Sequence, residues 1–334
     1  MFSELESDTS AITSRSPETK ASTNLVALVS SELGVPPKLI EDALRLAFTK
    51  FRKIRIPKRS GGLRTIMQPA AELKLVHCWL SSKVFSSLPI STIASAFHPG
   101  ASILKNASVH RSARYSVRID ISDFFPSIRS TDLDRVIKAS ASILPTGIAT
   151  ADFASFIRRA CFDRADRLPI GYPTSPSIAN AVMFDFDNEL IRLIREDAIQ
   201  FGRAQLTRYA DDFVFSTDKA GACKAFVEAA RALISKTESP RLTINDAKTR
   251  YMSRLGGSTL VTGLRINQNG NVRVHATYRD HVRLLLKHFR TGSLKPEEHQ
   301  QLVGHLAYIE HIDPMLFTRL SYRYFEEIAQ LRGQ

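Results

Sequence analysis

The sequence predicts an α+β fold in which a sheet domain is flanked by helical parts. Apolar residues alternate in two candidate hairpins, at residues 206–216 and 260–274, as is typical of half-buried strands. A long helical pattern precedes the first hairpin. From Tyr278 to the end the pattern is helical, with breaks at "TGSLKPEE" and "DPM". Strands and helices gathered in separate runs favour the α+β class.

The composition describes a basic protein with a large core. Its 334 residues include 46 Lys and Arg against 33 Asp and Glu, a formal net charge of +13. This balance favours a polyanionic partner, nucleic acid or an anionic membrane surface, although merely basic proteins share it. At 43% hydrophobic the chain can bury a large core, and its length predicts two or three subdomains.

Cysteine usage and hydropathy argue against export and membrane insertion. The three cysteines are isolated, so neither a disulfide framework nor a zinc motif is expected. No stretch approaches the roughly 18 consecutive apolar residues of a membrane span. The Ser/Thr-rich N-terminus resembles no signal peptide. We therefore expect a protein of a reducing cytosol.

The elements of the first half follow from periodicity and from Gly and Pro signals. A flexible tail is expected over residues 1–22 because it lacks large apolar side chains. The elements expected next are helices at 24–33 and 38–51, a basic hairpin turning on Gly61-Gly62, a helix at 71–87, a strand at 117–121 and a helix at 131–139.

In the second half, Ser175 is a candidate N-cap, and Pro176 is expected to open one long helix. Its apolar face would carry Ile178, Val182, Phe186, Leu190 and Ile194. The hairpin "LTRYADDFVFS" follows, then a helix at 220–236 and a hairpin turning on Asn269-Gly270.

Asp211 and Asp212 lie side by side at the tip of "LTRYADDFVFS", where a tight turn more often carries glycine. Two unit charges about 4 Å apart repel by roughly 4 kcal/mol at an effective dielectric of about 20, so a partly buried pair needs a cation. A solvated acidic turn is the simpler interpretation of the pair alone. Asp120 ends the strand "VRID", and three carboxylates at strand ends can hold two Mg²⁺ ions for phosphoryl transfer. Only the fold could bring Asp120 to the pair.

Six blocks, in order over residues 54–267, resemble the motifs of reverse transcriptases. "RYADDFVFS" resembles the catalytic Tyr-x-Asp-Asp hairpin, "VRIDISDFFPSI" the first catalytic strand and "LPIGYPTSPSIAN" the Pro-x-Gly-x-Pro-Thr-Ser-Pro segment. "IPKRSGGLRTIMQP" resembles the fingers hairpin, "LTINDAKT" the Asn-x-x-Lys segment and "LVTGLRIN" the primer-grip hairpin. The resemblance implies a right-hand polymerase: fingers and a palm built on an antiparallel sheet with helices over residues 23–275, and a helical thumb over 276–334.

Two further blocks narrow the resemblance to bacterial retron reverse transcriptases. "NASVH" resembles an Asn-Ala-x-x-His block of those enzymes and "VTG" a Val-Thr-Gly block. A loop with a core histidine and an ordinary hairpin strand are the alternative interpretations. The nucleic-acid contacts that the resemblance implies here are Asn106, His110, Val261, Thr262 and Gly263.

The resemblance also implies roles at the catalytic centre. The metal ligands would be Asp120, Asp211, Asp212 and the backbone carbonyl of Ile121. Phe125 matches a steric gate that excludes a ribose 2′-hydroxyl, or is a core phenylalanine. Lys248 matches a lysine that protonates pyrophosphate, or is a surface lysine.

Further candidates for nucleotide contacts lie in the fingers and in the Pro-rich segment. They are Lys58, Arg64, Gly171, Ser175 and Asn180. Lys58 and Arg64 flank the glycine tip, where an Arg fork and a Lys charge suit triphosphate oxygens, although basic residues are often only solvated. Ser175 could equally be only an N-cap. Ile170 stands where related enzymes carry glutamine and cannot form its hydrogen bonds, which puts catalytic efficiency in doubt.

Helical spacing alone, independent of the resemblance to reverse transcriptases, predicts a basic stripe in the C-terminal region. Arg279, Arg283, Lys287 and Arg290 are four, four and three residues apart, opposite the apolar residues Val282, Leu285, Leu286 and Phe289. Such a helix suits a thumb that faces a duplex backbone. A solvated helix face is the alternative.

The resemblance as a whole implies RNA-templated DNA synthesis from dNTPs with two Mg²⁺ ions, for which Mn²⁺ is a possible substitute. A retron enzyme would use a structured noncoding RNA of the msr-msd type as template and primer, starting from a guanosine 2′-hydroxyl. It would make branched RNA-linked DNA (msDNA) in the bacterial cytoplasm and serve phage defence with a separate effector protein. The alternatives are an intron, abortive-infection or diversity-generating reverse transcriptase, or a catalytically weak RNA-binding scaffold. Oligomeric state does not follow from the sequence.

Overall fold

The computed structural model describes residues 18–57, 61–145, 148 and 151–333. The chain divides into two compact units, Met1–Leu88 with Ile128–Ile178 and Pro89–Ser127 with Ala179–Gln334. The expected division at residues 22 and 275 follows polymerase subdomains instead, and it stays a prediction. In the described part of the chain, no helix is both long and apolar enough to cross a membrane.

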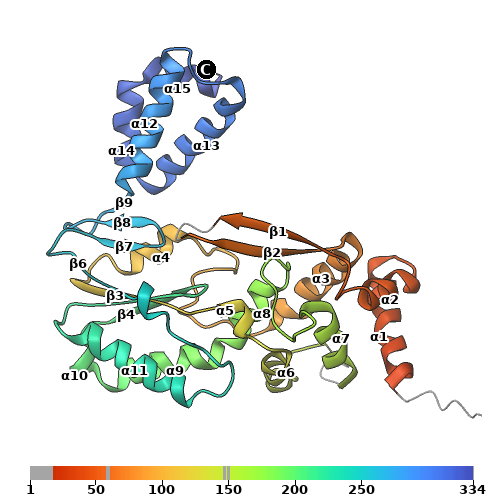
Figure 1. The fold of residues 1–334 in the computed structure, drawn as a ribbon. Helices are drawn as coiled ribbons and strands as arrows, with labels where there is room; N and C mark the ends of the chain where they lie inside the picture. The colour runs from red at the N-terminus through yellow and green to blue at the C-terminus, as the bar shows by residue number, and fades with distance from the viewer. Residues whose placement is uncertain (1–17, 58–60, 146–147, 149–150, 334) are drawn as a thin grey trace, which may run out of the picture. The chain divides into compact units, whose positions relative to one another are not determined.

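The first unit packs helices beside a two-stranded hairpin (Figure 1). Its elements are α1 (Glu18–Leu33), α2 (Pro37–Arg45), β1 (Phe51–Pro57), β2 (Leu63–Pro69), α3 (Ala71–Lys83), η1 (Phe85–Ser87), α6 (Ser130–Ala139) and α7 (Ala151–Cys161). The predicted hairpin is confirmed, with antiparallel pairs from Phe51↔Pro69 to Pro57↔Leu63. The helix expected at 38–51 is too long, because α2 ends at Arg45. Helix α1 begins within the range expected as a tail, whose residues 1–17 lie outside the described ones.

The second unit is built on a four-stranded antiparallel sheet in the order β4-β5-β3-β6. These strands are β3 (Tyr115–Asp120), β4 (Gln205–Tyr209), β5 (Asp212–Thr217) and β6 (Arg250–Ser253). On one side lie α9 (Phe184–Glu196), α10 (Ala198–Phe201) and α11 (Ala222–Lys236); on the other lie α4 (Ile103–Val109) and a small sheet of β7 (Thr259–Val261), β8 (Leu264–Ile266) and β9 (Val272–Val274) (Figure 1). The short helix α5 (Phe124–Ser127) follows β3, and the short helix η2 (Asp246–Lys248) precedes β6.

The alternation along β5 assigns each of its residues to one of these sides. Phe215 stacks on Phe226 of α11 with 4.3 Å between ring centroids, and Phe213 meets Phe186 of α9 edge to face. Val214 belongs instead to the apolar cluster that includes Ala107 of α4. Because side chains alternate across a strand, Asp212 shares the face of Val214. This face is the one that carries the acidic site.

Two expectations for the second half need correction. The single helix expected after Ser175 is two helices, α8 (Ser175–Val182) and α9, with a break at Met183. Ser175 is the first residue of α8 and so not its N-cap, and its hydroxyl donates to the Pro169 carbonyl at 2.7 Å. The hairpin expected around Gly270 is confirmed, and β7 extends it to three strands.

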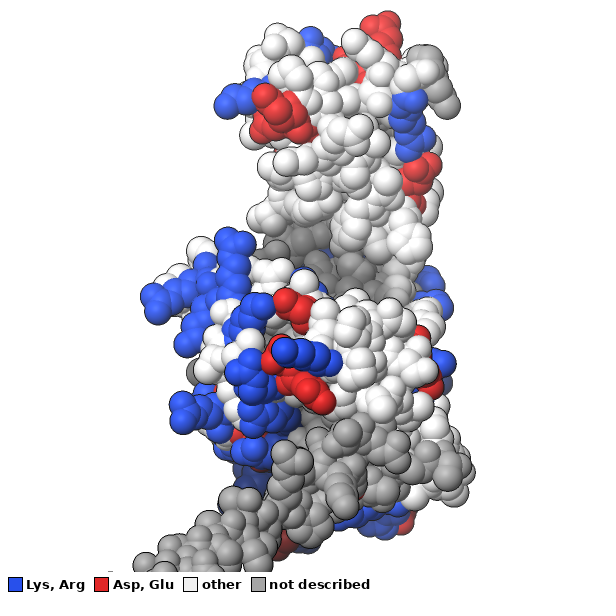
Figure 2. Space-filling model, turned by 90° about the vertical axis from the view of Figure 1, so that its right-hand side faces the viewer, with Lys and Arg blue, Asp and Glu red and all other residues white. Residues whose placement is uncertain are grey.

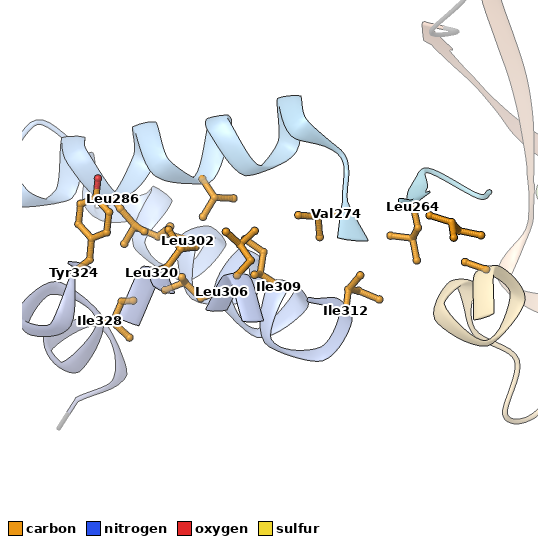
Figure 3. Close-up of a cluster of buried hydrophobic side chains, with 14 of the residues drawn as sticks. Leu264, Val274, Leu286, Leu302, Leu306, Ile309, Ile312, Leu320, Tyr324 and Ile328 are labelled. Atoms are coloured by element: carbon orange, nitrogen blue, oxygen red, sulfur yellow. The ribbon is translucent and has the colours of Figure 1, made fainter. Parts of the chain in front are cut away.

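The C-terminal helices confirm the predicted helical pattern. They are α12 (Ala276–Arg290), α13 (Pro296–Ile312), α14 (Pro314–Arg323) and α15 (Phe325–Arg332). Figure 3 shows their shared apolar core, in which Leu286, Leu302 and Leu306 are at most 1% exposed. Burial of each such side chain stabilises the fold by roughly 2 kcal/mol. The same cluster continues through Val274 and Leu264 into the small sheet.

Candidate active site

Strands β3 and β5 place Asp120 directly opposite Asp212 in their antiparallel register. Asp211 lies in the turn before β5, and its carbonyl accepts a hydrogen bond from the Ile121 N–H at 3.0 Å. Asp120, which precedes Asp211 by 91 residues in the chain, therefore meets the adjacent Asp211 and Asp212 at one end of the sheet. Like charges in directly opposed strand positions destabilise a sheet. Their convergence therefore points to a chemical role.

The turn that carries Asp211 has no glycine, and Ala210 adopts the left-handed conformation that a glycine would usually take there. Tyr209 pairs with Asp212, so the loop consists of Ala210 and Asp211 alone. Ala210 has φ +58°, a left-handed conformation that costs an L-residue roughly 1–2 kcal/mol. A hydrogen bond to its carbonyl from the Arg208 guanidinium, at 3.3 Å, helps to hold this conformation.

Arg208 lies on the face of the sheet opposite to Asp212, on the side of α9, and it is fully buried. Its guanidinium donates to both carboxylate oxygens of Asp187 on α9 at 2.7 to 3.0 Å, and to Asn180 Oδ1 at 3.2 Å. Burial raises the pKa of the Asp187 carboxyl, and the charge of Arg208 opposes that shift. This network fixes the hairpin from behind. No sequence pattern indicates this network, because Asp187 and Arg208 lie in different elements.

Two cations partly offset the negative charge of the site. Lys248 Nζ lies 2.9 and 3.1 Å from the two carboxylate oxygens of Asp120. Arg118 Nε lies 3.8 Å from Asp212 Oδ1. Burial raises the pKa of Asp212 to about 6, and Asp211 and Asp120 add to this shift while Arg118 and Lys248 oppose it.

A carboxyl pKa this high means that the surroundings do not compensate the negative charge of the carboxylate. A bound divalent cation would provide the missing positive charge. Hard carboxylate and carbonyl oxygens are the ligands that such an ion prefers. The described residues contain no ready-made group of three His, Cys, Asp or Glu metal ligands. Asp120, Asp211 and Asp212 thus supply the right kind of ligand atoms for a divalent ion, while their carboxylates are not gathered into a finished site.

Phe125 follows β3 by five residues and is half-buried. Its ring lies 5.4 Å from that of Phe124 and 6.2 Å from that of Phe97. Phe97 in turn lies 6.5 Å from the ring of Tyr209, so the aromatic group reaches the residue that precedes the acidic turn. Phe97 was not anticipated from the sequence.

Several residues predicted to contact the nucleotide belong to the first unit, whereas the aspartates belong to the second. Lys58 lies outside the described residues. Arg64 is exposed on β2. Gly171 has φ +103°, and a Cβ there would lie 2.4 Å from Ile66 Cγ2, so β2 packs too closely for any other residue. The carbonyl of Ile170 accepts a hydrogen bond from the Met67 N–H at 2.7 Å.

The two retron-like blocks are built into the second unit and touch each other. Asn106 is 1% exposed, and its amide nitrogen lies 3.5 Å from the Thr262 hydroxyl. Thr262 and Gly263 form the β7–β8 turn with φ +45° and +83°, after the fully buried Val261. Their roles as nucleic-acid contacts stay predictions.

His110 is 1% exposed and reaches both strands of the catalytic hairpin. Its Nδ1 lies 2.7 Å from Ser216 Oγ on β5, and its Nε2 lies 2.8 Å from Thr207 Oγ1 on β4. Burial lowers the pKa of His110 to about 4, so the imidazole is neutral. The histidine therefore joins the two strands from the side opposite Arg208.

The basic stripe of α12 is only partly available to a partner. Val282 and Leu286 are fully buried, which confirms the apolar stripe. Arg279 and Arg283 share Asp280 at 2.9 and 3.3 Å, and Lys287 is exposed. Arg290 pairs with Glu327 of α15 and lies over the Tyr324 ring at 4.6 Å. Arg290 therefore ties the helices together.

The first unit exposes further cations on its hairpin. Four cations are exposed there: Arg52, Lys53, Arg55 and Arg64. None of them forms an ion pair with an Asp or Glu among the described residues. Figure 2 shows Lys and Arg side chains gathered on one side of the face that it presents. Exposed cations without an acidic partner among the described residues suit a phosphate backbone.

An antiparallel sheet that brings Asp120 to an acidic hairpin turn is the arrangement expected of the palm of a right-hand polymerase. Residues 56–296 match the family described as "Reverse transcriptase (RNA-dependent DNA polymerase)", so the chain belongs to that family. Reverse transcriptases depend on divalent metal ions and copy an RNA template.

Relatives narrow the family further. The chain is 38% identical over 285 residues to the Retron Ec73 reverse transcriptase of Escherichia coli, covering 84% of this chain and 89% of that one. It is 27% identical over 286 residues to the Retron Ec83 reverse transcriptase of the same species, covering 83% and 88%. By its likeness to these retron enzymes, the protein is an RNA-directed DNA polymerase of the retron type.

Among solved structures, the chain is similar to a telomerase from Candida albicans, with 10% identity over 87% of this chain and 60% of that chain and a TM-score of 0.48.

Proposed function

We propose that this polymerase copies a structured noncoding RNA of the msr-msd type into branched, RNA-linked single-stranded DNA (msDNA). The opposition of Asp120 and Asp212, with the pKa of Asp212 raised to about 6, carries the catalytic part of the proposal. The retron relatives and the contact between Asn106 and Thr262, which joins the two retron-like blocks, support the msDNA part. By the same likeness, the enzyme works in the bacterial cytoplasm, in antiphage defence with a separate effector protein.

The acidic site would hold two Mg²⁺ ions, or Mn²⁺ as a substitute, through Asp120, Asp211, Asp212 and the Ile121 carbonyl. Metal ions held there would supply the charge that activates the primer hydroxyl and stabilises the leaving oxygen. Lys248 is the proton donor for pyrophosphate, since its ammonium group is held beside Asp120.

Other residues bind and select the substrates. Phe125 excludes a ribose 2′-hydroxyl and so favours dNTPs, and Lys58 and Arg64 bind the triphosphate. Gly171, Ser175 and Asn180 act indirectly. Gly171 packs against β2, Ser175 bonds the Pro169 carbonyl, and Asn180 is buried between Ala96 and Arg208. In a thumb at residues 276–334, Arg279, Arg283 and Lys287 contact the duplex backbone, with Arg290 bracing the helices.

Sequencing the nucleic acid that co-purifies with the chain tests this proposal. A single structured RNA joined through a 2′ linkage to DNA is the expected result. An intron or a variable-repeat RNA would indicate another class of reverse transcriptase.

Catalysis is tested with the same preparation, dNTPs and Mg²⁺, by comparing the wild-type chain with Asp211→Asn. Extension by the wild type alone is expected. If neither protein extends the RNA, the chain is an RNA-binding scaffold, and the role of Ile170 in place of glutamine becomes the first explanation to examine.

A further inference from the structure

Phe97 has an unusual backbone and an unusual position. Its φ of +62° lies in the left-handed region, where bulky residues are genuine outliers, and 40% of the residue is exposed. A partly exposed phenylalanine side chain gains little hydrophobic stabilisation, so burial alone does not account for the strained backbone of Phe97. Strain of this kind persists where the surroundings enforce it, and it is concentrated at functional sites.

The segment before Phe97 is fixed on both sides. The Ser95 N–H donates to the Arg208 carbonyl at 2.8 Å, and the Arg208 N–H donates to the Ile93 carbonyl at 2.7 Å. The Ala96 carbonyl accepts from Asn180 Nδ2 at 2.8 Å. The buried network behind the acidic hairpin thus also determines where the chain delivers Phe97.

The Phe97 ring lies near two aromatic residues of the site. Its centroid is 6.2 Å from that of Phe125, with the planes inclined by 54°, and 6.5 Å from that of Tyr209, inclined by 42°. Phe124 contacts Phe125 edge to face at 5.4 Å, and Phe124 is itself 3% exposed. Phe125 therefore has a buried neighbour in Phe124 and a more exposed one in Phe97.

We propose that Phe97 is a positioning residue for sugar selection, which holds the Phe125 ring where it excludes ribonucleoside triphosphates. This inference rests on the proposed function, since it takes Phe125 to be the steric gate. Without Phe97, the Phe125 ring can turn into the space that the Phe97 ring fills, and the space for a 2′-hydroxyl opens. Asn180 then serves selectivity by holding the Ala96 carbonyl, without touching the nucleotide.

The test is single-nucleotide incorporation of dCTP and CTP on a primed RNA template by the full chain, with kcat/KM measured for each. Phe97→Gly removes the ring and suits the left-handed backbone. We expect it to lower the preference for dCTP by roughly three- to tenfold, the range that loss of one aromatic contact allows. Phe97→Tyr keeps the ring and should keep the preference. Phe125→Ala should lower the preference at least as far as Phe97→Gly, and the double variant Phe97→Gly/Phe125→Ala no further than Phe125→Ala alone.

Other outcomes separate the two proposals. If Phe125→Ala loses selectivity while Phe97→Gly lowers both reactions equally, the gate stands and the role of Phe97 is overturned. Additive losses in the double variant overturn it as well. If the wild type makes no DNA, or Phe125→Ala keeps full selectivity, the proposed function or its gate fails first and the role of Phe97 falls with it. Thermal melting checks that each variant is folded. If Phe97→Gly is unfolded, Phe97→Leu replaces it. Tyr322→Ala serves as the control, because Tyr322 on α14 is 92% exposed.

Discussion

Asp120 and Asp212 face each other across β3 and β5, so the sheet places two carboxylates where a stable fold would avoid them. Lys248 lies on Asp120 at 2.9 Å, whereas Arg118 remains 3.8 Å from Asp212. The second carboxylate is therefore the less compensated of the two. The site trades stability for the capacity to bind cations.

Replacing Asp212 by Asn should stabilise the metal-free protein and abolish DNA synthesis. The pKa of Asp212 is raised to about 6, so its contribution to stability is present below about pH 4 and is lost as the pH rises through about 6. At pH 7.5 in chelator, Asp212→Asn should raise the free energy of unfolding by about 1–3 kcal/mol. Urea titrations at pH 4 and 7.5 measure this, with Asp218→Asn, which breaks an exposed pair with Arg203, as the control. A destabilised Asp212→Asn protein at pH 7.5 would contradict the argument.

Replacing Lys248 should slow catalysis without weakening nucleotide binding. Loss of a general acid typically costs about 10²- to 10⁴-fold in rate, so Lys248→Met should lower kcat by that order and leave KM similar. Lys248→Arg keeps the charge but hardly releases a proton, so it should not restore the rate. Rapid-quench single turnovers distinguish the two variants, with Lys236→Met at the end of α11 as the control. Full activity of Lys248→Arg would show that charge alone matters.

The local parts of the site could be predicted from the sequence, because they depend on short patterns. Alternation identified the β4–β5 hairpin, and the motifs around Asp120 and Asp211 identified the strand ends that the sheet brings together. The break at Met183 could not be predicted, since the apolar spacing continues through it from α8 into α9.

The supporting residues depend on tertiary contacts and were missed for that reason. Arg208 looks like a strand residue bound for solvent until α9 supplies Asp187. His110 was expected to contact nucleic acid, but its side chain is enclosed between Thr207 and Ser216. No pattern in the sequence indicates the left-handed backbone of Phe97.

The buried pair of Arg208 and Asp187 should be strongly coupled. Removing one partner leaves an uncompensated buried charge, so Arg208→Met and Asp187→Leu should each lower the free energy of unfolding by about 3–5 kcal/mol. The double variant should lose much less than the sum, because no charge then remains buried. A double-mutant cycle in urea measures the coupling, with the exposed pair of Arg203 and Asp218 as the reference. Additive losses would mean that the two residues act independently.

The neutral imidazole of His110 should make the catalytic hairpin sensitive to acid. Burial lowers its pKa from 6.5 to about 4, so the unfolded chain binds a proton at a pH where the folded chain does not. The resulting stability is fully present above about pH 6.5 and is lost as the pH falls towards 4, by about 3 kcal/mol. His77, hydrogen-bonded to the Ala160 carbonyl, has a pKa lowered to about 4 by burial and should contribute a similar loss.

His110→Gln can hydrogen-bond but does not titrate in this range, so it should remove the contribution of His110 to the acid sensitivity, about 3 kcal/mol. The free energy of unfolding would be measured at intervals from pH 4 to 7.5 for the wild type, His110→Gln and His77→Gln. His288→Gln, exposed on α12, serves as the control and should keep the wild-type slope. An unchanged pH slope in His110→Gln would show that the imidazole is protonated in the folded hairpin, contrary to its burial.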